Sequence, residues 1–255
     1  MNNTPSLQLH LQTVPARNGL LWIRHGFKVF QRKPLALASL LLTFFFLALL
    51  LLLVPAAGVL VLLMALPLLS LGFMLATHLV LQNQTPTAAV FIAPLKLTPQ
   101  RRKTQLMLGL AYASGVLLIA LLVNWIDNGS AEALQRLWAS GASNEQMSAA
   151  AADPRLLWST LARVVLTVLL SVPFWHAPAL VHWGGQGLMQ ALFSSTLGIW
   201  RNKAAFALNM LMWGGLLMAS SMLLSLVALL PGMSALLMLV ALPLGLVLST
   251  VFYAT

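Results

Sequence analysis

The sequence predicts an all-α polytopic membrane protein. We expect six transmembrane helices in three parallel hairpins, with amphipathic interfacial helices on the cytoplasmic face. Three observations lead to this fold class. The 255 residues are 60% hydrophobic and only 7% charged, whereas soluble domains carry about 25% charged residues. Long uncharged runs alternate with short basic segments, and all four acidic residues fall within positions 127–153.

The distribution of the cations predicts the orientation in the membrane. The formal net charge of +10 would indicate a nucleic-acid partner in a soluble protein. Here eleven of the fourteen lysines and arginines lie in three short segments, at 17–33, 96–103 and 201–203, and no aromatic residue interleaves with those at 101–103 to stack bases. Short loops rich in Lys and Arg stay cytoplasmic. We therefore predict a multi-pass protein of the bacterial inner membrane, with both termini cytoplasmic and no nucleic-acid partner.

Ten of these cations form the predicted cytoplasmic basic face, whose partners are anionic lipid headgroups. They are Arg17, Arg24, Lys28, Arg32, Lys33, Arg101, Arg102, Lys103, Arg201 and Lys203.

The chain begins with a polar segment and an amphipathic helix. Residues 1–14 lack the layout of a secretory signal, and we expect a flexible N-terminus followed by one membrane domain at 15–255. At 17–33, apolar residues recur every three or four positions beside a basic face. This pattern predicts a helix lying on the membrane surface. The alternative is a helix packed under the bundle.

Six apolar segments are long enough to cross a hydrocarbon core of about 30 Å. They are 35–54, 59–81, 104–125, 155–181, 204–230 and 233–253. Tight turns join the first and last pairs, and the outside loop 126–154 joins the middle pair. In this loop, 131–139 after an N-cap at Ser130 and 143–152 predict short helices, and Asp153 with Pro154 begins the fourth span. We interpret the acids of the loop as a solvated face, with an interaction or catalytic role as the alternative.

Prolines inside the return spans indicate kinks, because an interior proline removes a helical hydrogen bond. The kink prolines are Pro67, Pro173, Pro178 and Pro243. The sequence around Pro67 resembles that around Pro243, and a basic stop at 30–33 matches one at 200–203, which favours three repeated hairpins. A glycine-rich turn at 184–187 precedes a second amphipathic helix, and Ala111 with Gly115 permits close helix packing.

Few polar residues are candidates for function within the spans. They are Arg163, His176, His182, His78 and Asn209. Arg163 lies eight residues past Arg155, where its side chain is either functional or extends to the headgroups. His176 and His182 are six residues apart and point to different sides of a helix, so they make a poor metal pair unless His78 joins them. The alternatives are a metal or proton-relay role and packed core or interfacial histidines.

The run FWHAPALVHW at 174–183, followed by the amphipathic helix and by WRNK at 200–203, resembles a family of uncharacterised six-helix inner-membrane proteins of proteobacteria. That family is distantly similar to the membrane domain attached to some glycerophosphodiester phosphodiesterases. The resemblance implies a location and a fold, and no activity. Relatives often have a second histidine where this chain has Gly184, which argues against a histidine-cluster metal site.

The sequence favours a protein without catalytic activity. It has no cysteine, no paired carboxylates and no zinc motif, and we expect neither an enzyme nor a bound cofactor or metal. No Asp or Glu lies in any span, which disfavours cation-coupled transport. The first hypothesis is an accessory, assembly or scaffold component with a membrane-protein partner. The alternative is a transporter or lipid-handling protein with a pathway between the kinked helices. A cavity lined by Arg163, His176 and Asn209 would favour this alternative.

Overall fold

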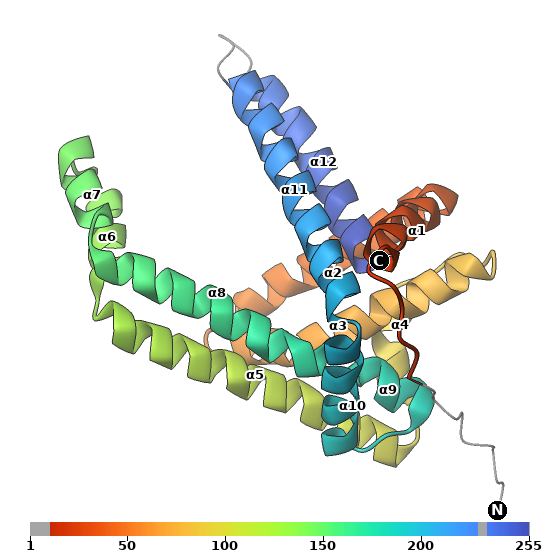
Figure 1. The fold of residues 1–255 in the computed structure, drawn as a ribbon. Coiled ribbons are helices and arrows are strands. Elements are labelled where there is room, and N and C mark those ends of the chain that lie inside the picture. Colours follow the sequence, from red (N-terminus) through yellow and green to blue (C-terminus); the bar gives the residue numbers. More distant parts are fainter. Residues whose placement is uncertain (1–10, 229–233, 255) are drawn as a thin grey trace, which may run out of the picture.

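The computed structural model describes residues 11–228 and 234–254 (Figure 1), and this part of the chain contains helices and no strand. The all-α prediction is therefore confirmed for the described residues. The expected flexible N-terminus lies mostly outside them. The long helices are α1 (Asn18–Arg32), α2 (Pro34–Leu52), α3 (Ala57–Leu81), α5 (Pro99–Asp127), α8 (Pro154–Phe174), α10 (Leu188–Arg201), α11 (Lys203–Ala228) and α12 (Ser234–Ala254). The short ones are α4 (Ala89–Ile92), the 3-10 helix η1 (Ala93–Lys96), α6 (Ser130–Ala139), α7 (Asn144–Ala151) and α9 (Ala177–Gly184).

The long helices pack in pairs that follow the order of the chain. Helix α2 packs on α3, α5 on α8, and α11 on α12. The α5/α8 pair and the α11/α12 pair diverge from a common region that contains α9 and α10 (Figure 1). Helix α1 packs against α11 and α12, and α3 packs against both α5 and α9. We call this region, where the pairs meet with α1, α9 and α10, the junction.

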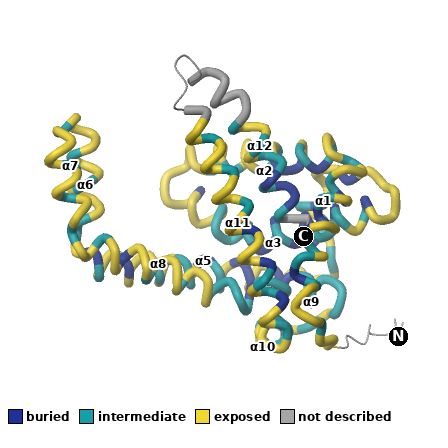
Figure 2. Tube along the Cα trace, turned by 45° about the horizontal axis from the view of Figure 1, so that its top comes forward, coloured by how far each residue is buried: buried dark blue, intermediate teal, exposed yellow. Residues whose placement is uncertain are grey.

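Five helical segments in the described part of the chain are long and apolar enough to cross a membrane, and one of them consists of α8 and α9 together. They are Pro34–Leu52, Ala57–Leu81, Pro99–Asp127, Pro154–Gly184 and Lys203–Leu226. In α12 the apolar stretch Ala241–Phe252 is shorter, and part of the predicted sixth span falls outside the described residues. Away from the junction most residues of these helices are exposed (Figure 2). The exposed residues include many leucines and valines and the tryptophans Trp125 and Trp158. Such a surface requires lipid around it, because a soluble protein rarely exposes large apolar patches.

Buried side chains concentrate at the junction in three clusters. One lies between α2, α3 and α4, where Phe73 packs edge-on against Phe91 at 5.8 Å between ring centroids. A second surrounds Leu108 of α5 and joins it to α8, α9 and α10. The third includes Trp213 of α11 and connects it to α1 and α12. Each helix pair thus has its own core at the junction, and α1, α4, α9 and α10 fill the spaces between the pairs.

Helix α5 contains the predicted third span and extends beyond it: it begins at Pro99, because proline is favourable in the first helical turn, and ends at Asp127. Pro178 is not an interior kink, since the predicted fourth span divides into α8 and α9 and Pro178 lies in the first turn of α9. Pro67, Pro173 and Pro243 do lie inside helices, in α3, α8 and α12.

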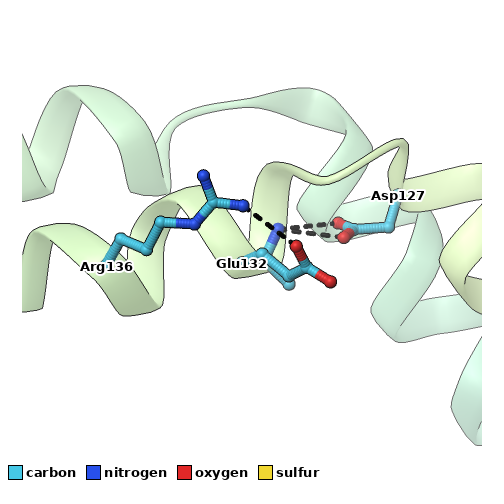
Figure 3. Close-up of polar contacts among 4 residues, drawn as sticks. Asp127, Glu132 and Arg136 are labelled. Atoms are coloured by element: carbon cyan, nitrogen blue, oxygen red, sulfur yellow. Dashed lines mark hydrogen bonds and ion pairs between the residues drawn. The ribbon is translucent and has the colours of Figure 1, made fainter.

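The connection between α5 and α8 contains both short helices that the sequence predicts, α6 and α7. Ser130 does not cap α6 as expected: the backbone N–H of Ala131 donates to both carboxylate oxygens of Asp127, at 3.1 and 2.9 Å (Figure 3). Ser130 Oγ donates instead to Asp153 Oδ2 at 2.6 Å, which ties the start of α6 to the start of α8. The exposed Arg136–Glu132 pair in Figure 3, at 3.0 Å, contributes about 0.5 kcal/mol or less.

The Ser130–Asp153 contact predicts a pH effect. The Ser130 hydroxyl and then the backbone N–H of Arg155 hold the pKa of the Asp153 carboxyl below its usual range. A lowered folded-state pKa stabilises the fold above the ordinary Asp pKa, and this stabilisation is lost as the pH falls through the lowered value. We expect Ser130→Ala to raise the pKa of Asp153, measured by carbon-13 NMR of the aspartate carboxyls in micelles. Ser143→Ala, which removes the cap of α7, should leave that pKa unchanged, and an equal titration in both variants would contradict the prediction.

Candidate functional site

The break between α8 and α9 places His176 in the centre of the junction. Pro178 has no N–H and cannot donate to the carbonyl of Phe174, so the helix is interrupted here. Ser195 of α10 fills the gap: the His176 backbone N–H donates to Ser195 Oγ at 3.1 Å, and Ser195 Oγ donates to the Val172 carbonyl at 3.0 Å. In a continuous helix these two backbone groups would bond to each other. The buried Ser195 hydroxyl therefore replaces one helical hydrogen bond and stabilises the break.

Two further side chains, both from α5, donate hydrogen bonds to backbone carbonyls of α9. Gln105 is fully buried and its Nε2 donates to the Pro178 carbonyl at 2.8 Å. Arg101 Nη1 donates to the His182 carbonyl at 3.1 Å, near the negative end of the α9 dipole. Arg101 therefore differs from Arg102 and Lys103 beside it, which are exposed. Arg101, a member of the predicted basic face, therefore also makes a hydrogen bond within the protein.

This difference predicts unequal effects of two neighbouring arginines. We expect Arg101→Ala to lower the free energy of unfolding by about 1–2 kcal/mol, because the His182 carbonyl loses a charged donor. Arg102→Ala should change it by less than about 0.5 kcal/mol, since an exposed side chain away from such contacts contributes little. Unfolding in mixed detergent micelles, followed by far-ultraviolet circular dichroism, measures both variants. Equal losses would show that the Arg101–His182 contact does not stabilise α9.

Three adjoining compartments meet at His176. The first, of about 460 Å³, lies between α3, α5, α8 and α12 and is lined by Pro67, Thr77 and Tyr112 among others. The second, of about 350 Å³, lies between α9, α10 and the segment 11–14. The third, of about 300 Å³, is lined by Asn209 and Trp213 of α11 together with residues of α1 and α12. His176 lines all three, so one residue adjoins spaces formed by most elements of the junction.

Aromatic rings surround His176. The imidazole packs edge-on against Phe206 at 5.7 Å between ring centroids. Phe206 in turn contacts Trp22 at 5.0 Å, and Trp175 contacts Phe252 at 6.3 Å. Among the described residues, the hydrogen bond of His176 is made by its backbone N–H, and none is made by its imidazole. The polar imidazole of His176 thus packs among aromatic rings, and His176 borders the three compartments.

The N-terminal segment closes the second compartment. The Val14 backbone N–H donates to Asn202 Oδ1 at 2.8 Å, and Asn202 Nδ2 donates to the Gln12 carbonyl at 3.0 Å. One side-chain amide thus binds two backbone groups of the segment, which lies along α10 and α11. Of the segment 11–14, Leu11, Gln12 and Val14 line the compartment.

The structure brings together only some of the predicted candidates. His176 and Asn209 both line the third compartment, and Asn209 Nδ2 also donates to the Gly19 carbonyl at 3.0 Å. Arg163 is exposed on α8 and lines none of the three compartments. His78 and His182 both pack against Trp183, at 6.3 and 5.2 Å between centroids, rather than against His176.

Several residues of the site were not predicted to belong to it. Ser195 was expected only as part of an amphipathic face, whereas Gln105, Trp22, Trp213 and Phe206 were not singled out. Their only signal in the sequence is a polar or bulky aromatic residue within or beside an apolar stretch. That signal does not say which helix faces which.

The chain is similar over nearly its whole length to one curated protein. A probable inner membrane protein of Burkholderia thailandensis is 28% identical over 248 residues, which cover 97% of this chain and 91% of the relative. No family model and no solved structure matches the chain. The relative and the five long apolar helical segments together support an integral membrane protein. The resemblance to the membrane domain of glycerophosphodiester phosphodiesterases stays a prediction.

Proposed function

We propose that this chain is a non-enzymatic membrane protein that binds a membrane amphiphile, a molecule with a polar head and an apolar chain, in the compartments around His176. The observation that supports this function is that three compartments adjoin one polar residue, His176, at the junction of the apolar helices. Pockets for small molecules typically measure about 300–1,000 Å³ and are mostly apolar with few polar groups. The compartments therefore favour a lipid-handling protein over a scaffold with a packed centre. A scaffold with a membrane-protein partner stays a prediction.

The proposal includes six spans in three hairpins, with α12 as the sixth. It places both termini and the basic segments in the cytoplasm and the segment with α6 and α7 outside. In support, Lys33 follows the last residue of α1, Arg101 lies in the first turn of α5 and Lys203 begins α11. The four acids lie at 127–153, the segment with α6 and α7, which is at the far end of the α5/α8 pair from α9 and α10 (Figure 1). With this topology His176 lies in the cytoplasmic half of the membrane.

Helices α1 and α10 are proposed to lie at the cytoplasmic membrane surface. Helix α10 exposes Met189, Phe193 and Trp200, spaced four and seven residues apart and therefore on one face. Lys203 Nζ lies 4.9 Å from the centroid of the Trp200 ring, at the end of that face. The apolar face would enter the acyl region while the cations meet anionic headgroups, each contributing about 1 kcal/mol.

The binding proposal is tested by filling the first compartment. Ser70 of α3 lines that compartment, so a tryptophan at this position would occupy the space of a ligand. We expect wild-type protein purified in detergent to retain lipid in native mass spectrometry and Ser70→Trp to retain much less. Ser221→Trp, at an exposed position of α11, is the matched control. Equal retention in the two tryptophan variants, both folded by circular dichroism, would overturn the proposal.

The topology is tested with single cysteines, since the chain has none. We expect Ser140→Cys, between α6 and α7, to react with a membrane-impermeant maleimide in intact spheroplasts. Gln84→Cys, between α3 and α4, should react only after permeabilisation. Labelling of Gln84→Cys in intact spheroplasts would contradict the proposed orientation.

A further inference from the structure

We infer that the third compartment receives an uncharged head group bearing a hydrogen-bond acceptor, such as the carbonyl of a diacylglycerol or a quinone, and that the first compartment receives the attached apolar chain. This inference rests on the proposed function and specifies its ligand. It follows from the charge of the lining, from two buried polar groups without partners, and from the way the compartments adjoin.

The lining favours a neutral ligand. None of the described residues that line the three compartments is Lys, Arg, Asp or Glu. A phosphate in these compartments would be a buried charge without a cationic partner, which is far more costly than burying a neutral polar group. Arg101 of α5 lies against α9, but its side chain already donates to the His182 carbonyl and lines none of the compartments. The compartments therefore discriminate against phospholipid head groups.

Two unpartnered donors indicate an acceptor on the ligand. Trp213 lines the third compartment and is only 2% exposed, and its Nε1–H has no partner among the described groups. The indole N–H can only donate, so only an acceptor can satisfy it. The Thr77 hydroxyl, buried beside the first compartment, also lacks a partner. Buried donors are normally hydrogen-bonded, because leaving one unpaired is costly.

The compartments adjoin in the order that such a ligand requires. Trp175, His176 and Phe252 line both the first and the third compartment. The larger first compartment is bordered by apolar side chains including Leu66, Met74 and Phe174. A head at Trp213 would thus continue past His176 into a space suited to a hydrocarbon chain.

Photolabelling of the reconstituted full-length protein tests the inference. Vesicles of phosphatidylethanolamine and phosphatidylglycerol receive a trace of diazirine-bearing diacylglycerol or of diazirine-bearing phosphatidylglycerol, and labelled residues are mapped by mass spectrometry. We expect the diacylglycerol probe to label the first compartment, for example at Met74, more than the phosphatidylglycerol probe does. Unlabelled diacylglycerol or ubiquinone is then added as a competitor. The compound that lowers the labelling more is the better ligand of the two.

A matched pair of variants tests the role of Trp213. Trp213→Phe keeps an aromatic ring but removes the N–H, and labelling at Met74 should fall about fivefold, as expected for one neutral hydrogen bond. Trp138→Phe on α6, where the side chain is 76% exposed, should leave labelling unchanged. Unchanged labelling in Trp213→Phe would overturn the assignment of the head group.

The outcomes separate this inference from the proposed function. Labelling by phosphatidylglycerol that equals or exceeds that by diacylglycerol, and that disappears in Ser70→Trp, would retain a lipid-binding cavity and reject the neutral head. No labelling of the first compartment above that of the lipid-facing surface, with either probe, would reject the proposed function as well. The comparison of probes on wild-type protein requires no variant to fold.

Discussion

Gly109→Ala lowers the free energy of unfolding by about 2 kcal/mol, whereas Gly115→Ala on the same helix leaves it unchanged or raises it. A Cβ atom at Gly109 would overlap the carbonyl oxygen of Met64 and lie 3.2 Å from its carbonyl carbon. Both are backbone atoms of α3, so α3 and α5 would have to separate. At Gly115 the new Cβ meets Leu170 Cδ1 at 2.6 Å, the end of a flexible side chain that can rotate away. Alanine also gains about 1 kcal/mol of helix propensity at either position.

Unfolding in mixed micelles, followed by circular dichroism, measures both variants. Because the two substitutions are identical and lie six residues apart on one helix, their difference isolates the backbone contact between α3 and α5. Equal effects would show that the two helices are less closely packed than the structure indicates. The sequence had indicated Ala111 with Gly115 as a pair that permits close packing. Gly115 does lie against the Leu170 side chain, whereas Gly109, which was not singled out, lies against the backbone of α3.

This difference separates the features of the fold that neighbouring residues determine from those that depend on distant residues. The sequence predicted helices at 17–33 and 131–139, and the structure has them at Asn18–Arg32 and within Ser130–Ala139, because periodicity, caps and uncharged length are properties of neighbouring residues. Which side of a helix faces a partner is different information. Within α5, the stretch 106–123 is apolar on nearly all sides, and its sequence therefore leaves the packing face undetermined.

The same limit applies to the site. His176 and Asn209 were predicted because polar residues are conspicuous in apolar spans, and both line the third compartment. Arg163 was singled out on the same ground, yet it is exposed on α8. Trp213 and Ser195 were not recognised, since their roles depend on contacts between helices distant in sequence. The hydrogen bonds of Ser195 reach back 19 and 23 residues to a helix whose break is itself a tertiary feature.

Ser195→Ala is therefore expected to have the second large effect, a loss of about 2 kcal/mol in the free energy of unfolding. Without the hydroxyl, the His176 N–H and the Val172 carbonyl both lose their partner at once. They can pair directly only if α8 continues through Trp175, and Pro178 opposes this because it has no N–H for the following turn. Hydrogen–deuterium exchange of the segment 172–184 should accordingly become faster than in wild type.

Ser220→Ala in α11 is the matched control, because the Ser220 hydroxyl donates only to Leu216 one turn earlier in its own helix. Removing this hydroxyl breaks no hydrogen bond between helices. We therefore expect the free energy of unfolding to change by less than about 0.5 kcal/mol and the hydrogen–deuterium exchange at 172–184 to stay as in wild type. If Ser195→Ala behaved like this control, the break at Trp175–His176 would be stable without α10. The position of His176 would then depend on Pro178 and on the hydrogen bonds that Arg101 and Gln105 of α5 make with α9, and not on Ser195 of α10.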